Sequence, residues 1–516
     1  MTYSYICCYV ISQNLLFMKK QFILPLAVAF SLMLSLCGCS GNEQLLDTIP
    51  ADAPGIVTVN VNRLMDAMDG VKHGGNLTAA ETLDKFLVNS SERCHREITT
   101  ILTSASIDRE LMAGFAISGK DRGLNAFKHP GEYVYTFKIK NRSSFIAEIG
   151  AEPEPKSIDG FDVYALEDVN LVIKDKQGWL VWGEPAKAVA TLSAELNRAA
   201  NTPISSLKGI HKYLSEDDDD IFRLAIARSA AADGWTCISG DVEDNARKLE
   251  VDAKFIDGNG KEKDMDAYLD RINTSLLDYT MPSDIFVMAI GIKGDTDWDA
   301  LIDYFQSIYP LDYRQRALAG MVLPYLKRLD GTILIAAGLD DTSHLDPASI
   351  AGNINFTVAV QMKKNEVKKT MSDLRDIISM MGLPVVDKGD EFVMQSPGTA
   401  PVSLKAEGNS IILSNRSLKQ LGNNAAREVA KGNSLAIWTG IPDAIGEATY
   451  GGKGFNLKME LEDDFKMSFS FTDASTPVLE QIALLMSADS DSPANTQIDS
   501  REPDNSIGFT PIDTVR

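Results

Sequence analysis

The side chains most often used in catalysis and metal binding are sparse in this sequence. None of its five histidines stands at the spacing of a helical metal motif or beside a GxSxG serine. Cys94 and His95 are adjacent, but on a helix their side chains diverge by about 100°, so they do not readily share one metal ion. The histidines are His73, His95, His129, His211 and His344. We predict no catalytic residue, no metal site and no cofactor, while enzymatic activity itself stays open.

The densest run of charge, residues 215–220, offers carboxylate oxygens of the kind that bind Ca²⁺. It lacks the glycine and the alternating acids of a calcium loop, and the matching later loop, residues 430–433, contains no acid. These differences favour a solvated loop over a metal site.

One group of aromatic residues is dense enough to suggest a contact surface. Trp179 and Trp182 lie three apart on an expected strand, so they should face opposite sides of a sheet. Together with Tyr133 and Tyr135 they are the candidates for contact with a ligand or partner.

The N-terminal region has the layout of a signal peptide, assigned to residues 1–38. Two lysines at 19 and 20 precede an apolar run over 22–36, which is shorter than the roughly 20 residues that span a bilayer. Met18, directly before the lysines, is the expected true start.

The apolar run ends in Leu36-Cys37-Gly38-Cys39, which resembles a bacterial lipobox. The resemblance implies transfer of diacylglycerol to the Cys39 thiol and cleavage after Gly38. Residues 39–44 then form a lipidated tether, at most ~20 Å long when extended. Ser40 favours outer-membrane sorting, and the weak acidity of residues 41–44 favours the periplasmic face over surface exposure.

Two further cysteines, Cys94 and Cys237, remain after the signal peptide. An oxidising envelope permits a Cys94–Cys237 disulfide, and two buried thiols fit the sequence equally well.

The sequence carries an internal repeat. A Leu-Leu-Asp turn followed by Pro-x-Asp occurs at residues 45–52 and again at 276–284, and each copy enters an apolar strand. Alternating strands at 249–255 and 465–471 close the copies. We predict an α+β fold of two tandem copies, 45–275 and 276–487, each a mainly antiparallel sheet covered by helices.

The overall charge restricts the classes of partner. The chain has 50 Lys and Arg against 72 Asp and Glu, a net charge of -22. This acidity argues against nucleic acid and against electrostatic adhesion to anionic lipid, because both need clustered Lys and Arg. Residues 488–516 are acidic and rich in Pro and Ser, so we expect a disordered tail.

The lipobox and the entry Ile49-Pro50-Ala51-Asp52-Ala53-Pro54 resemble those of a family of bacteroidete-type envelope lipoproteins of about this length. The family has no assigned activity, so the resemblance implies a cellular location and a fold and identifies no catalytic residue. The expected function is a lipid-anchored binding or assembly protein that meets the membrane through its lipid and contacts an envelope protein. The alternatives are a ligand-capturing lipoprotein that serves a transporter and an envelope hydrolase with a site between the repeats.

Overall fold

The computed structural model describes most of the chain after residue 44. The described residues are 45–88, 95–117, 132–151, 154–166, 169–216, 220–227, 234–257, 259–262, 268–302, 313–339, 354–380, 384–395, 400–416 and 422–490. Within them, no helix combines the length and the apolar character that crossing a bilayer requires. The predicted signal peptide, the tether and all but the first three residues of the predicted tail lie outside this description.

The first half of the described chain contains ten strands. They are β1 (Gly55–Val59), β2 (Met112–Ala116), β3 (Tyr133–Lys138), β4 (Lys156–Ile158), β5 (Phe161–Ala165), β6 (Val169–Lys174), β7 (Gln177–Trp182), β8 (Phe222–Ala227), β9 (Trp235–Glu243) and β10 (Lys248–Ile256). The helices are α4 (Val61–Met68), α5 (Ala79–Val88), α6 (His95–Thr103), α7 (Arg142–Glu148), α8 (Pro185–Asn201), η2 (Ile204–Ser206) and α9 (Lys208–Ser215).

The second half again supplies ten strands in the described residues. They are β11 (Asp284–Ile292), β12 (Leu329–Leu339), β13 (Ile354–Met362), β14 (Val385–Asp387), β15 (Glu391–Met394), β16 (Val402–Glu407), β17 (Ser410–Ser414), β18 (Leu435–Ile441), β19 (Phe455–Leu461) and β20 (Phe465–Phe471). The helices are η3 (Thr274–Tyr279), α11 (Tyr313–Leu326), α13 (Val367–Met380), α14 (Asn424–Ala430), α15 (Asp443–Tyr450) and α16 (Val478–Ser490).

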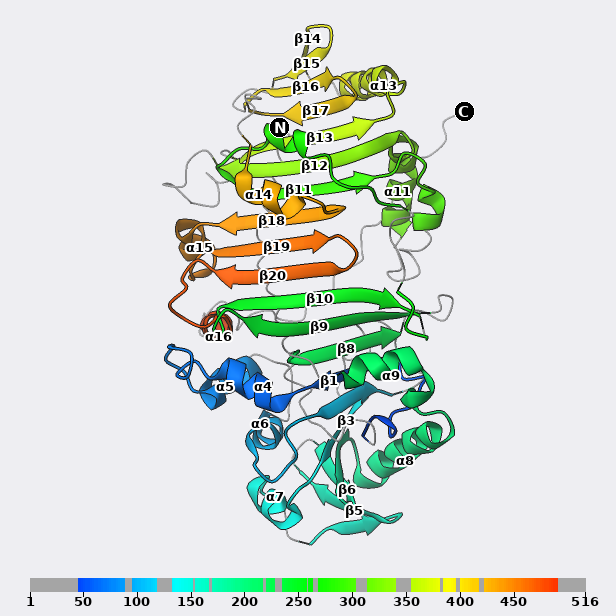
Figure 1. The fold of residues 1–516 in the computed structure, drawn as a ribbon, viewed down its shortest axis with the longest axis vertical. Helices are drawn as coiled ribbons and strands as arrows, with labels where there is room; N and C mark the ends of the chain where they lie inside the picture. Colours follow the sequence, from blue (N-terminus) through cyan, green and yellow to red (C-terminus); the bar gives the residue numbers. More distant parts are fainter. Residues whose placement is uncertain are drawn as a thin grey trace, which may run out of the picture.

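All twenty strands belong to one antiparallel sheet, so the prediction of two tandem sheets is wrong. The halves are joined by β10 and β20, which pair antiparallel from Lys248↔Ser470 to Ala253↔Phe465 (Figure 1). Each of these strands is the last of its half and would otherwise leave an open row of backbone donors and acceptors. Pairing the two edges satisfies both rows at once.

Strand order is the same on both sides of this seam. Pairing runs β4-β5-β6-β7-β3-β2-β1-β8-β9-β10 in the first half. It runs β14-β15-β16-β17-β13-β12-β11-β18-β19-β20 in the second. The order of corresponding strands is therefore the same from either end of the sheet, and the seam lies at its centre.

The main hydrophobic core crosses the seam. One cluster on one face of the sheet includes Leu64 and Phe86 from α4 and α5, Leu249 from β10, Phe469 from β20 and Leu479 from α16. A second cluster fills the opposite face of the first half beneath α8 and α9. Two smaller clusters serve the second half. The halves share a core as well as a sheet.

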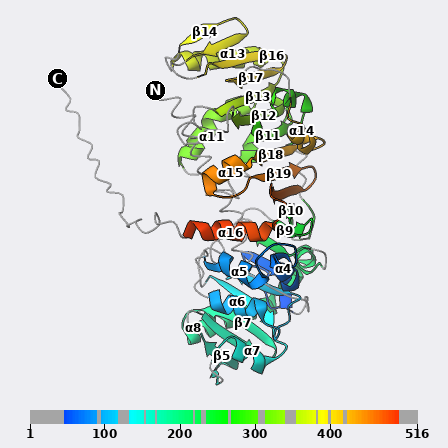
Figure 2. The same ribbon diagram turned by 90° about the vertical axis from the view of Figure 1, so that its left-hand side faces the viewer.

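Helix α16 belongs to the second half in sequence but packs against α5 and α4 of the first half (Figure 2). Its Glu480 side chain is buried, with the residue 1% exposed, and accepts hydrogen bonds from the backbone N–H groups of Asn76 at 3.0 Å and Leu77 at 3.3 Å. A Cβ at Gly70 or Gly75 would overlap the Glu480 carboxylate, so this loop requires glycine at both positions. The C-terminal helix thus completes the N-terminal half.

The β9–β10 turn holds the start of α16. Asp244, Asn245 and Ala246 all have positive φ, at 52°, 54° and 63°, a conformation that costs roughly 1–2 kcal/mol per non-glycine residue. The Ala246 carbonyl accepts from Val478 N at 2.7 Å, and Arg247 donates to the His73 carbonyl at 3.1 Å. Contacts from both halves therefore keep this strained turn in place.

We expect Leu479→Ala to lower the free energy of unfolding by about 2–5 kcal/mol, because it opens a cavity in the shared core. Amide hydrogen exchange should rise in α4 and α5 of the first half as well as in α16. The exposed Leu484→Ala on the same helix is the matched control and should cost less than about 0.5 kcal/mol. Loss of protection confined to α16 would contradict a shared core.

Candidate functional site

The middle of the sheet leaves most of one face without a helix. Strands β9, β10, β20, β19 and β18 face the viewer between α9 and α14 in Figure 1. At one margin, α14 packs against β18 and β19, and its buried side chains cluster with Ala436. Side chains on this side follow from strand alternation and from the registers of the four ladders. We call this surface the central face. It consists of Ser239, Asp241, Lys248, Glu250, Asp252, Lys254, Lys466, Ser468, Lys458, Glu460 and Trp438.

Charges of opposite sign alternate from β10 to β20 to β19 across the central face. Asp252 on β10 lies opposite Lys466 on β20, and Lys466 lies opposite Glu460 on β19. In the next row Glu250 lies opposite Ser468, which lies opposite Lys458. Each cross-strand pair of opposite charge contributes a few tenths of a kcal/mol up to about 1 kcal/mol. One pair is alike in sign, because Asp241 on β9 lies opposite Glu250. With Glu243, on the same side of β9, the central face has five acids against four lysines, so it is close to neutral in a strongly acidic chain.

The reverse side of the same strands is apolar and carries the shared core. Leu249, Phe469 and Leu457 point away from the central face and are buried in this core, and Val251, Met459 and Met467 pack against it half-buried. Asp252, Lys458 and Lys466, on the central face, are exposed. This contrast means that the five strands need no further cover for stability on their polar side.

Trp438 is the one large aromatic side chain of the central face. It is half-buried, opposite Lys458 in the ladder, and its ring lies over Gly440, where an added Cβ would be 2.6 Å from the indole. Sequence reasoning did not single out this residue. The available signal was the pattern Ala436-x-Trp438-x-Gly440, a tryptophan between two small residues on one side of a strand.

A buried arginine borders the central face at β8. The Arg223 side chain is 4% exposed and donates to Asp220 at 3.0 Å and to the carbonyls of Tyr213 at 2.7 Å and Glu216 at 2.9 Å. Glu216 and Asp220 belong to the acidic run, whose residues 217–219 lie outside the description. In the described part of the chain, no three His, Cys, Asp or Glu side chains are grouped as a metal site.

Burial raises the pKa of Asp220 to about 6. A hydrogen bond with Ser239 opposes this shift, while the negative charges of Asp241, Asp252 and Glu216 add to it. Burial also raises the pKa of Asp252, against the attraction of Lys466. Asp220 and Asp252 thus hold protons more tightly than free aspartates do.

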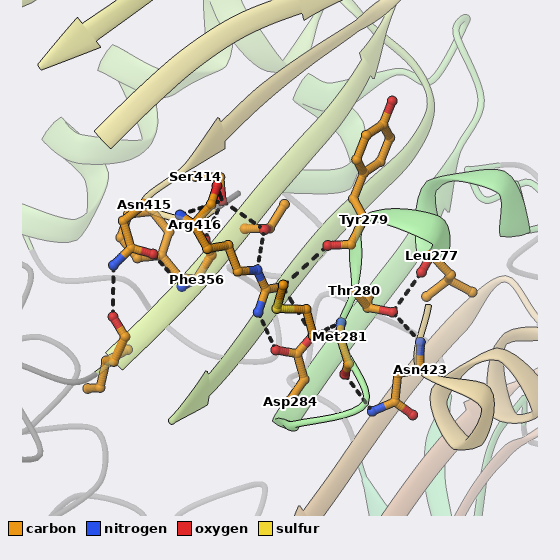
Figure 3. A network of polar contacts seen from close by, with 12 residues as sticks. Leu277, Tyr279, Thr280, Met281, Asp284, Phe356, Ser414, Asn415, Arg416 and Asn423 are labelled. Carbon is orange, nitrogen blue, oxygen red and sulfur yellow. Dashed lines mark hydrogen bonds and ion pairs between the residues drawn. The ribbon is translucent and has the colours of Figure 1, made fainter. Parts of the chain in front are cut away.

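The Pro-x-Asp entry of the second half is the centre of a buried polar network (Figure 3). Arg416 forms a two-pronged ion pair with Asp284, and the two side chains are 5% and 0% exposed. Arg416 also donates to Thr357 at 2.9 Å, and Asp284 accepts from Met281 N at 2.7 Å. These contacts tie the turn before β11 to the end of β17, which is a structural role.

The corresponding Asp52 of the first half is also paired with an arginine, but at the surface. Its partner is Arg198 in the last turn of α8, at 2.9 Å, with side-chain exposures of 60% and 49%. The same short motif therefore makes a solvated pair in one half and a buried pair in the other.

The four predicted aromatic contact residues lie in the core. Tyr133, Tyr135 and Trp182 pack against one another with ring centroids 4.8–5.3 Å apart. Trp179 points to the other side of the sheet and meets Phe161 at 6.1 Å. Only Trp182 of the four is half-buried rather than buried. Contact of these rings with a ligand or partner stays a prediction.

Of the predicted cysteine sites, only Cys237 is described. It lies on β9 and is fully buried. Cys39 and Cys94 lie outside the described residues, so lipidation and the Cys94–Cys237 pairing both stay predictions.

We expect Arg416→Met to lower the free energy of unfolding by about 3–5 kcal/mol, because it leaves the Asp284 carboxylate buried without its partner. Arg198→Met is the matched control from the other half and should cost less than about 1 kcal/mol. Urea unfolding of the two variants measures the difference. Equal losses would contradict the contrast in burial between the two pairs.

We expect Asp220 to make the protein less stable as pH rises from about 4 to about 6. Its folded-state pKa lies above the ordinary value of 3.8, so the folded state binds the proton more tightly and loses that advantage as the carboxyl ionises. Asp220→Asn should remove this slope from the pH dependence of urea unfolding.

Asp443→Asn is the control for this slope. Hydrogen bonds from Thr472 and Gly454 lower the pKa of Asp443. Its contribution to the free energy of unfolding therefore changes mainly below about pH 4. A slope that persists in Asp220→Asn would contradict the assignment.

Comparison with known proteins gives no family. No family model and no curated protein matches this chain. A solved structure entitled "Structure of crystal form I of TP0453" aligns with 42% of this chain and 80% of its own, at 12% identity and a TM-score of 0.26. A likeness of this size supports no inference about function.

Proposed function

We propose that this protein is a lipid-anchored cell-envelope protein without a catalytic role, which binds or assembles another envelope protein through its central face. The observation that carries the proposal is the contrast between the two sides of the five central strands. One side is packed into the shared core, while the other presents ordered charges and a half-buried tryptophan.

The chemistry of the central face suits a folded protein partner. Alternating Asp252, Lys466 and Glu460 would select a partner with the complementary charge order, because like charges brought together cost several kcal/mol. Trp438 supplies the kind of rigid, partly apolar side chain that often dominates binding energy at interfaces.

The proposed anchor would hold this surface near a membrane. Leu45 and Leu46, directly after the tether, are buried in the core beneath α8 and α9, so the tether leaves the body at a fixed place. An extended tether from Cys39 reaches at most ~20 Å. The outer membrane, on its periplasmic side, is the proposed location.

A photo-crosslinking side chain at Ser468, in cells, tests the proposal. Ser468 lies in the centre of the central face, and Ser193 on α8, also half-buried, is the matched control position. We expect one envelope protein to crosslink at Ser468 and not at Ser193. Lys458→Glu combined with Lys466→Glu should reduce this product about tenfold or more, since both lysines become acids.

Cys39→Ala tests the anchor in the same cells. It should move the protein from the membrane fraction to the soluble fraction and prevent labelling with a fatty-acid probe. Equal crosslinking at Ser468 and Ser193, or a product that survives reversal of both lysines, would contradict the central face as the working surface. Membrane retention of Cys39→Ala would contradict the anchor alone.

A further inference from the structure

Four of the large apolar side chains that are exposed in the described residues lie on two helices of the second half. Met321 and Val322 are on α11, and Ile377 and Met380 are on α13. The two methionines are 72% and 79% exposed. We call these four residues the tip patch. Figures 1 and 2 place α11 and α13 beside the strands of the second half, far along the sheet from α4–α9.

The two helices are joined by one arginine. Arg328, just after α11, donates to Thr370 at 3.0 Å and to Asp373 at 2.6 Å, both on α13. At 100° per residue, Ile377 and Met380 lie one and two turns beyond Asp373 on the same flank of α13. Ile377 and Met380 therefore lie on the flank of α13 that Arg328 contacts, two residues after the end of α11.

Helix α11 lacks the polar face of a water-exposed helix. Its sequence is YRQRALAGMVLPYL, and after Arg316 every residue except Tyr325 is apolar or glycine. A helix with apolar residues on all sides normally has protein or lipid around it. Yet Met321 and Val322, in its middle, are exposed. This helix is incompletely covered in the described structure.

The surroundings of the tip patch are basic, although the chain is acidic. Helix α11 contains Arg314 and Arg316 and no acidic residue. Three lysines at the start of α13 are exposed and have no ion pair within the described residues: Lys364, Lys368 and Lys369. Of the nearby carboxylates, Asp373 and Glu366 pair with Arg328, at 2.6 Å and 3.6 Å. Asp376, beside Ile377, is exposed, so the three exposed lysines outnumber this exposed acid.

We propose that the tip patch docks on an anionic lipid surface, with its apolar side chains among the acyl chains and its lysines at the headgroups. Charge complementarity selects this occupant, because clustered lysines near an anionic leaflet each strengthen binding about fivefold. The patch also lacks the Trp, Tyr or Arg centre of a protein interface. The inference uses described residues only and does not depend on lipidation of Cys39.

Vesicle sedimentation of the full chain carrying Cys39→Ala, which removes the proposed acyl chains, tests the patch by itself. We expect binding to vesicles of equal parts phosphatidylcholine and phosphatidylglycerol, weak binding to phosphatidylcholine alone, and loss of binding in molar salt. Met321→Asp combined with Met380→Asp should reduce binding about tenfold or more, since both side chains would have to leave water as carboxylates.

Leu484→Asp on α16, an exposed apolar position outside the patch, is the matched control and should bind as the parent does. In a second measurement, the anionic vesicles should slow peroxide oxidation of Met321 and Met380. Sedimentation that is absent, independent of phosphatidylglycerol, or unchanged in the double methionine variant would overturn the proposal. Absence of binding would leave the tip patch to a protein partner, and failure here would not affect the test of Cys39 in cells.

Discussion

The pairing of β10 with β20 is the constraint on which the rest of the structure depends. Without it, each half would end in an open edge over the six positions that the seam pairs. With it, Leu249 and Phe469 meet on one side and extend a single core across both halves, while Asp252 and Lys466 meet on the other. One ladder therefore creates both the shared core and the polar surface above it.

Helix α16 makes this pairing difficult to undo. Its side chains Val478, Leu479 and Ile482 fill the core of the first half, and Glu480 satisfies two backbone donors of the α4–α5 loop. A buried carboxylate that lost these donors would pay its full desolvation cost. Separation of the halves would thus break a sheet ladder, a core and a buried hydrogen-bond network together, which favours a single cooperative unit over two independent domains.

The sequence predicted individual elements better than their assembly. Strict alternation of apolar and polar residues identified strands such as β10 and β20, because a strand that packs on one side has its apolar residues on that side only. Alternation does not say which edge pairs with which, so two sheets were expected where one exists. The same limit applies to the Pro-x-Asp motif: Asp52 and Asp284 occupy matching positions, and only the surrounding fold leaves one solvated and buries the other beside Arg416. Trp438 was missed because its half-buried place between α14 and the polar strands depends on how the elements assemble.

The central face and the tip patch impose different demands on the same rigid sheet. A surface that binds a folded partner needs its charges held in fixed register, and the hydrogen-bonded ladders of β9, β10, β20 and β19 provide that register. A surface that meets lipid needs no register, because acyl chains adapt to the side chains that enter them. The two proposals fit this difference, since the ordered charges lie on strands at the centre of the sheet and the exposed methionines lie on helices of the second half. If the protein were held at both the tether and the tip patch, the central face would lie between two membrane contacts. The protein could then rotate only about the line that joins those contacts.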